Sequence, residues 1–211
     1  YYVKGEVLLE RKCKSKLFIV KLMFLAAVAL PQKIDGGRKE WDGKIGIWPF
    51  SEIINAKRAS KNRPKGTPEV KPTTSVTKVH NRKMIIEKII PANVEKWPRS
   101  IRNDTPKVFI QQDNAGPHID VNNQEFLAAT ETVKNKLKNK LVAQPAMSPD
   151  LTVLDLGFFN ALQTIQYKKM CKIYEDLQAS VEDAFDKYST KSIANIWLNL
   201  QTIYNEVLKA K

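Results

Sequence analysis

The sequence is poor in the residues that build zinc sites and disulfide frameworks. Its 211 residues include two cysteines and two histidines, which are Cys13, Cys171, His80 and His118. Neither a C-x-x-C nor an H-x-x-x-H spacing occurs, so a structural zinc site is not expected. A disulfide is not expected either, which fits a reducing compartment such as the nucleus or the cytosol.

Acidic residues and long apolar runs are scarce as well. The chain has 22 Asp and Glu against 35 Lys and Arg, a net charge of +13. Such an excess favours a polyanionic partner, most often nucleic acid, although it also occurs in proteins that are merely basic. The apolar run at 22–30 follows Lys21 and ends at Pro31. It is too short to span a bilayer, so no membrane partner is expected.

Hydrophobic residues nevertheless make up 43% of the chain, which is enough for a packed core, and the length favours one domain over 1–211. Because the first residue is Tyr1 and not methionine, we expect a segment of a longer protein. The patterns predict strands at 17–29 and 44–50 around a glycine-rich turn at 31–43, then a helix at 75–97 that is kinked or interrupted at Pro91. They next predict a strand at 107–113, a helix at 123–137, a short strand at 141–143, a helix capped by Asp150 or Thr152, and C-terminal helices within 174–211, at 174–188 and 192–209.

The most informative stretch is K-V-F-I-Q-Q-D-N, residues 107–114. A short apolar run typical of a buried strand ends there at a carboxylate, Asp113. A second carboxylate, Asp155, follows in S-P-D-L-T-V-L-D-L-G-F-F. An aspartate just past a strand is also common as a turn residue or a helix cap, so spacing alone leaves the structural and the catalytic readings open.

A second segment, 53–72, combines many cations with residues that disfavour regular structure. Its prolines and glycine predict a loop. One reading is a solvated surface loop, and the other is a loop that grips the phosphates of a nucleic acid. The cations are Lys57, Arg58, Lys61, Arg63, Lys65 and Lys71, against the single carboxylate of Glu69.

Several stretches, in order, resemble plant mariner-like transposases of the Tc1/mariner group, which are DDE/DDD enzymes. The two strongest are V-F-I-Q-Q-D-N-A-G-P-H-I and Q-P-A-M-S-P-D-L-T-V-L-D-L-G-F-F. Four more are F-I-V-K-L-M-F-L-A-A-V-A-L-P, W-D-G-K-I-G-I-W-P-F, A-K-R-A-S-K-N-R-P-K-G-T and I-I-E-K-I-I-P-A-N-V-E-K-W-P. The resemblance covers nearly all the chain. It implies a ribonuclease-H-like α/β fold, a mixed sheet flanked by helices, in which this chain lacks the opening strand.

The resemblance also implies a metal site. Three carboxylates in that family hold Mg²⁺ or Mn²⁺ for DNA cleavage and strand transfer, and Asp113 and Asp155 match the second and third. Asp150 is a competing third carboxylate, although capping is its simpler explanation. The family's first aspartate would precede Tyr1 and is therefore absent here.

Two further residues fit the same pattern. Asn114 and His118 match the D-N-A-x-x-H motif, as groups that contact DNA or orient the carboxylates, although His118 is equally explained as structural.

Three functions compete at this stage. The first is a fragment of a transposase catalytic domain that does not cut DNA as given. The second is a non-enzymatic nucleic-acid-binding module derived from a transposase, and the third is a product without function. We expect DNA as the partner through Lys57, Arg58, Lys61, Arg63, Lys65, Asn114 and His118. A nuclear location is expected, and a homodimer is one way to cover the edge that a missing opening strand would leave.

Overall fold

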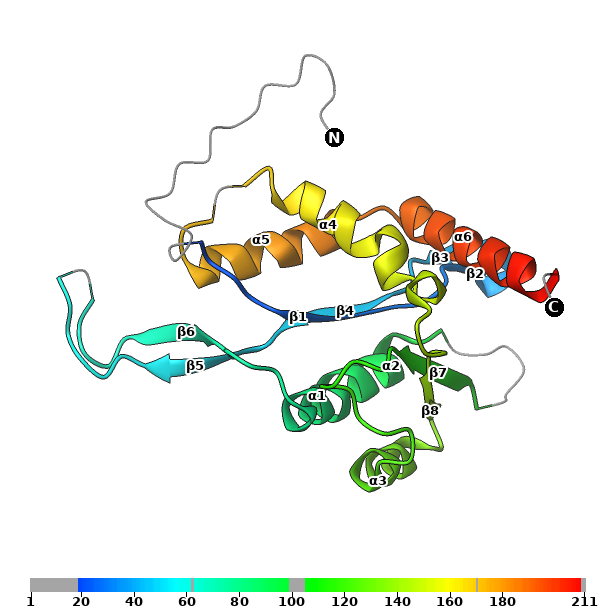
Figure 1. The fold of residues 1–211 in the computed structure, drawn as a ribbon, viewed down its shortest axis with the longest axis horizontal. Helices are drawn as coiled ribbons and strands as arrows, with labels where there is room; N and C mark the ends of the chain where they lie inside the picture. Colours follow the sequence, from blue (N-terminus) through cyan, green and yellow to red (C-terminus); the bar gives the residue numbers. More distant parts are fainter. Residues whose placement is uncertain (1–18, 62, 99–104, 170, 210–211) are drawn as a thin grey trace, which may run out of the picture.

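The computed structural model describes residues 19–61, 63–98, 105–169 and 171–209, and it is a mixed α/β structure (Figure 1). Its strands pair two by two within these residues: β1 with β4, β2 with β3, β5 with β6, and β7 with β8. Helices α4, α5 and α6 cover one side of the β1–β4 pair, and α1, α2 and α3 lie on the other side with β7 and β8. The expected α/β class is confirmed at this level.

The β1–β4 hairpin is the central layer, and its alternating side chains serve two separate cores. β1, Phe24–Val28, pairs antiparallel with β4, Lys44–Pro49. Ala26 faces the core under α4–α6, with Phe24 and Val28 packed against that core. Leu25 and Ala27 pack against the opposite core, around Ile85 and Phe126. The predicted strand pair is therefore confirmed, although the first strand is shorter than 17–29. Residues 17 and 18 lie outside the described residues, and Met23 is half exposed.

The connection between these two strands is more regular than the predicted turn. It contains a small hairpin of β2, Gln32–Ile34, and β3, Lys39–Trp41, joined by a 3₁₀ turn at Asp35–Gly37. Gly43 closes the connection with a φ of 74°, and a Cβ there would overlap the carbonyl oxygen of Ala29. Only glycine fits that position without strain.

The segment predicted as an irregular loop at 53–72 is mostly a β-hairpin, so that prediction is wrong. β5, Ser51–Asn55, pairs antiparallel with β6, Pro68–Pro72, and residues 56–67 form the outer end. Pro68 and Pro72 are tolerated because they occupy the two ends of β6, where a strand can do without a backbone donor. We call residues 51–72 the β5–β6 arm, because the hairpin extends away from the rest of the molecule (Figure 1).

The helix predicted at 75–97 is present, and it changes form just before Pro91 without being interrupted there. It runs as α1, Lys78–Met84, a π-helical turn at Ile85–Ile89, and α2, Ile90–Lys96. The wider π-helical turn directly precedes the proline, which cannot continue an ordinary ladder of i to i−4 bonds. Ile85, Ile89 and Ile90 are buried in the core that also contains Phe126 and Leu141.

The strand that leads to Asp113 is confirmed. β7, Lys107–Gln112, pairs in parallel with β8, Lys138–Ala143, across α3, Gln124–Val133. β8 is longer than the predicted 141–143. Val108 and Leu141 are buried on one face, whereas Phe109 points to the other face and is 63% exposed. Within the described residues, the β7–β8 pair is not hydrogen-bonded to the β1–β4 pair.

The C-terminal helices form the second layer around one aromatic side chain. α4 is Phe159–Gln166, α5 is Tyr174–Lys187 and α6 is Thr190–Lys209. Phe158 is fully buried and meets the rings of Phe159, Phe185 and Tyr188 edge to face. On α6, Ile193, Ile196 and Leu200 are buried in the core, whereas Tyr204, Val207 and Leu208 further along the helix are exposed. None of the described helices is long and apolar enough to cross a bilayer.

Candidate functional site

Asp113 lies directly after β7, where the chain turns away from the sheet. Its Oδ1 accepts a hydrogen bond of 2.8 Å from the backbone N–H of Ala115, which makes it a turn residue. The Nδ1 of His118 lies 2.6 Å from the same Oδ1 and 2.9 Å from the main-chain oxygen of Asp113. These contacts are those expected of a structural turn, and among the described residues they leave Oδ2 of Asp113 without a hydrogen bond.

Side-chain amides tie this turn to the segment that leads toward Asp155. Asn114 donates from Nδ2 to the carbonyl oxygen of Gln144, at 2.7 Å, and Gln144 N–H donates to the carbonyl oxygen of Gln112, at 2.8 Å. Gln111 donates from Nε2 to the carbonyl oxygen of Leu151, at 2.7 Å. The geometry thus favours an orienting role for Asn114 over a DNA contact. These contacts of Gln111 and Gln144 could not be predicted from the sequence, because their partners are backbone carbonyls that lie far away along the chain.

Asp155 lies on the π-helical turn Leu154–Phe158, which leads into α4. Desolvation by surrounding protein atoms, and then the negative charge of Asp113, raise the pKa of the Asp155 carboxyl, although residue 155 as a whole is exposed. The two predicted carboxylates are therefore near enough to repel each other. A position near a helix start would lower the pKa of a carboxyl. At Asp155, desolvation and the charge of Asp113 have the larger effect, and the pKa is raised.

Asp150 does not cap the following helix, and neither does Thr152, so the predicted cap is wrong. Asp150 lies in a 3₁₀ turn, Pro149–Leu151, and Val153 precedes the π-helical turn without a side-chain cap. The Asp150 carboxylate makes no hydrogen bond or ion pair within the described part of the chain. Unlike Asp155, it has no detectable interaction with Asp113. These observations favour Asp155 over Asp150 as the partner of Asp113.

The donor set does not fit a pair of divalent cations. No group of three His, Cys, Asp or Glu side chains that could hold a metal ion is present among the described residues. Asp113 and Asp155 are two carboxylates, and Oδ1 of Asp113 is already engaged by His118 and Ala115. A two-ion site for Mg²⁺ or Mn²⁺ needs about three convergent carboxylates. The described residues therefore do not supply the ligands of a two-ion site.

A shallow hollow of about 250 Å³ lies beside Asp113. Lys78 of α1 contributes to it from one side, and Asp113, His118 and Asp120 contribute from the turn after β7. It is smaller than the pockets that enclose drug-sized ligands, about 300–1,000 Å³, and its lining is mixed in charge. Lys78 was not singled out in the sequence, because only the fold brings α1 beside this turn.

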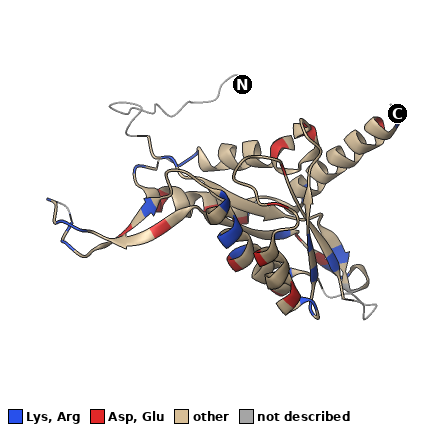
Figure 2. Cartoon of the chain, turned by 60° about the horizontal axis from the view of Figure 1, so that its bottom comes forward, with Lys and Arg blue, Asp and Glu red and all other residues tan. Residues whose placement is uncertain are grey.

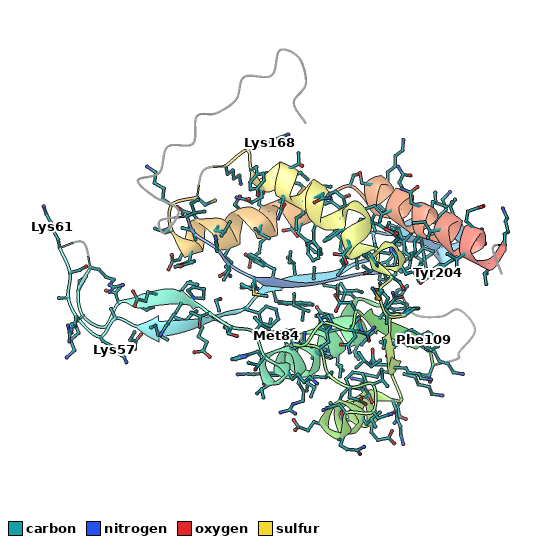
Figure 3. All side chains as sticks on the ribbon, in the orientation of Figure 1. Lys57, Lys61, Met84, Phe109, Lys168 and Tyr204 are labelled. Carbon is teal, nitrogen blue, oxygen red and sulfur yellow. The ribbon has the colours of Figure 1, made fainter. Side chains whose placement is uncertain are left out.

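The arm carries most of the predicted DNA-binding cations. Figure 2 shows Lys and Arg, without Asp or Glu, at its outer end, and Figure 3 shows Lys57 and Lys61 there. Arg63 is different from its neighbours, because its guanidinium pairs with Glu69. Among the described residues, the predicted DNA-binding cations of the arm without an ion pair or hydrogen bond are Lys57, Arg58, Lys61 and Lys65.

The repulsion at Asp155 gives a prediction about pH. A carboxyl whose pKa is raised by folding stabilises the folded state only at acid pH, and that contribution is lost as the pH rises through the folded-state pKa. Asp155→Asn should therefore raise the melting temperature at neutral pH, and the gain should vanish toward about pH 3, where the carboxyl is protonated in both states. Asp150→Asn controls for the loss of one negative charge. A lower melting temperature of Asp155→Asn at neutral pH would contradict the repulsion.

The chain was compared with protein-family models, with curated proteins and with solved structures, and none of the three comparisons gave a match.

Proposed function

We propose that this chain is a segment of a mariner-like transposase catalytic domain, with a ribonuclease-H-like fold, and that it binds DNA. The observation that carries the DNA binding is the outer end of the β5–β6 arm, where Lys57, Arg58, Lys61 and Lys65 have no acidic partner. Cations in such a position bind phosphates and release counterions from DNA.

The transposase part of the proposal has separate support. The motifs occur in the family's order along nearly all the sequence. β7 and β8 form a parallel pair, as a ribonuclease-H-like sheet requires, and Asp113 lies at the end of β7. The pKa of Asp155 responds to the charge of Asp113, as expected if both carboxylates descend from one site.

Salt dependence tests the DNA binding. We expect the chain to bind unrelated duplexes of about 30 base pairs with similar affinity, because phosphate contacts carry no sequence information. The logarithm of the binding constant should fall linearly with the logarithm of the salt concentration. Fluorescence anisotropy of labelled duplexes measures both. Failure to bind any duplex at low salt would overturn the proposed function.

We also propose that the chain, as given, does not cut DNA. Asp113 and Asp155 supply two carboxylates where two-ion phosphodiester chemistry needs about three. Incubation with supercoiled plasmid and Mg²⁺ or Mn²⁺ should therefore give no more nicked product than buffer alone. Asp113→Ala is the control, since nicking that survives this change comes from a contaminating nuclease. Nicking by the unchanged chain that Asp113→Ala abolishes would overturn the proposal.

The second candidate is a non-enzymatic DNA-binding module derived from a transposase. The turn at Asp113 favours it, because the Asp113 carboxylate already has partners within the turn. His118 and Ala115 already engage this carboxylate, so a purely structural role accounts for both residues. Under this candidate, Mn²⁺ should not bind to the chain by calorimetry. Mn²⁺ binding that Asp155→Asn removes would favour the catalytic-domain reading.

A further inference from the structure

We propose that the β5–β6 arm is a β-ribbon that enters the major groove of B-form duplex DNA. This inference rests on the DNA-binding function proposed above and adds the form of nucleic acid and the groove. The arm extends from the body as a single antiparallel pair (Figure 1). The cations at its outer end are therefore presented on a narrow projection and not on a broad flat surface.

The dimensions of the arm fit the groove. Paired strands lie about 4.8 Å apart, and a major groove about 12 Å wide and about 8.5 Å deep admits a two-stranded ribbon. The arm stays paired beyond its two strands, because Ala56 N–H donates to Thr67 O, and Gly66 N–H to Ala56 O, both at 2.9 Å. Ser60 and Arg63 form a further bridge near the end. A ribbon that is paired this far beyond its strands is suited to insertion.

The charges of the arm suit a ribbon that lies between the two phosphate backbones of a duplex. Arg63 is neutralised by Glu69, a residue of β6. The cations of the outer end that have no partner among the described residues come from both of its sides: Lys57, Arg58 and Lys61 lie on the side that continues β5, and Lys65 lies on the side that leads into β6. Cations on both sides of the ribbon can contact the phosphates of both backbones that border a groove. Cations on one side of the ribbon could contact only one backbone.

The composition of the arm favours a duplex over a single strand. Residues 51–72 contain no Phe, Tyr or Trp, and proteins that bind single strands stack bases on such side chains. Duplex RNA is also disfavoured, because its major groove is deep and too narrow for side chains to read. The arm therefore fits B-form DNA better than either alternative.

The base of the arm is fixed to the body, which gives the ribbon a defined direction. The backbone N–H of Val70, on β6, donates to Oε1 of Glu175 at 2.9 Å. Glu175 lies in the first turn of α5, whose inner face is part of the core around Phe158. An anchored ribbon loses less conformational freedom on insertion than a free loop would.

Chemical footprinting tests the groove. Dimethyl sulfate methylates guanine at N7 in the major groove and adenine at N3 in the minor groove. We expect the intact chain to protect guanine N7 in a bound duplex and to leave adenine N3 reactive. Replacing residues 57–66 by Asn-Gly, a two-residue turn between the paired Ala56 and Thr67, should remove the protection. An RNA duplex of the same sequence should compete less well than the DNA duplex.

The outcomes separate this inference from the function on which it rests. Binding with protection of adenine N3, or with no protection of guanine N7, would overturn the groove assignment and leave DNA binding intact. Equal competition by the RNA duplex would overturn it as well. Loss of all duplex binding by the intact chain would overturn the proposed function and the groove assignment together. Glu175→Gln can still accept the Val70 hydrogen bond, so this variant should keep the protection of guanine N7. Glu175→Ala loses the anchor and should make that protection weaker.

Discussion

Replacing Lys57, Arg58, Lys61 and Lys65 together by alanine is expected to flatten the salt dependence of duplex binding. Each phosphate contact contributes about −0.9 to the slope of log K against log salt, so losing four contacts should reduce the slope by about 3 to 4. The effect should be large because no acidic side chain in the described part of the chain pairs with these cations. Anisotropy titrations at several salt concentrations measure it directly.

A matched control removes four lysines elsewhere. Lys33, Lys39, Lys168 and Lys191 are exposed and lie outside the arm; Lys168 is labelled in Figure 3, beside α4. Their replacement by alanine changes the net charge equally, but it should change the slope much less. Equal slopes for the two quadruple variants would mean that the whole basic surface, and not the arm, binds DNA.

Arg63 is a separate test of the same idea. The sequence placed it with the DNA-binding cations, but its pairing with Glu69 gives it a different role. Arg63→Ala alone should loosen the outer end of the arm and leave most of the slope unchanged, because that guanidinium is not free to release counterions.

The parts of this fold that the sequence predicts are those that depend on short-range patterns of residues. The strand before Asp113 and the hairpin around Gly43 follow from apolar runs and turn residues, and both are present. The β5–β6 arm was missed because its prolines suggested a loop. Their positions at the ends of β6 are visible only once the register with β5 is known.

In the candidate site, too, some residues could be singled out from the sequence and others only from the fold. Asp113 was singled out because it follows an apolar run, and Asp155 because it lies in a motif that resembles the transposase family; the charge of Asp113 raises the pKa of Asp155. Gln111, Asn114 and Gln144 connect the two segments through backbone carbonyls. Contacts of this kind leave no trace in composition or periodicity, because any residue offers a carbonyl oxygen. The raised pKa of Asp155 could not be predicted from the sequence, since desolvation and a neighbouring charge depend on packing that the sequence does not encode locally.

Phe158→Ala should destabilise the chain more than any other change considered. Phe158 is fully buried and contacts the rings of Phe159, Phe185 and Tyr188, so its loss leaves a cavity at the centre of the C-terminal layer. Truncating a buried phenylalanine costs about 3–5 kcal/mol, against a total stability of about 5–15 kcal/mol for a typical domain. Denaturant unfolding followed by circular dichroism gives the difference.

Phe109→Ala is the matched control, because it removes the same atoms from a side chain that is 63% exposed on β7. Its cost should be a small fraction of that at residue 158. Phe158 also follows Asp155 within one π-helical turn and belongs to the core that supports α5, the helix that anchors the arm through Glu175. Phe158→Ala should therefore weaken DNA binding at temperatures where Phe109→Ala does not. Equal stability of the two variants would show that the layer of α4–α6 does not form the core described here.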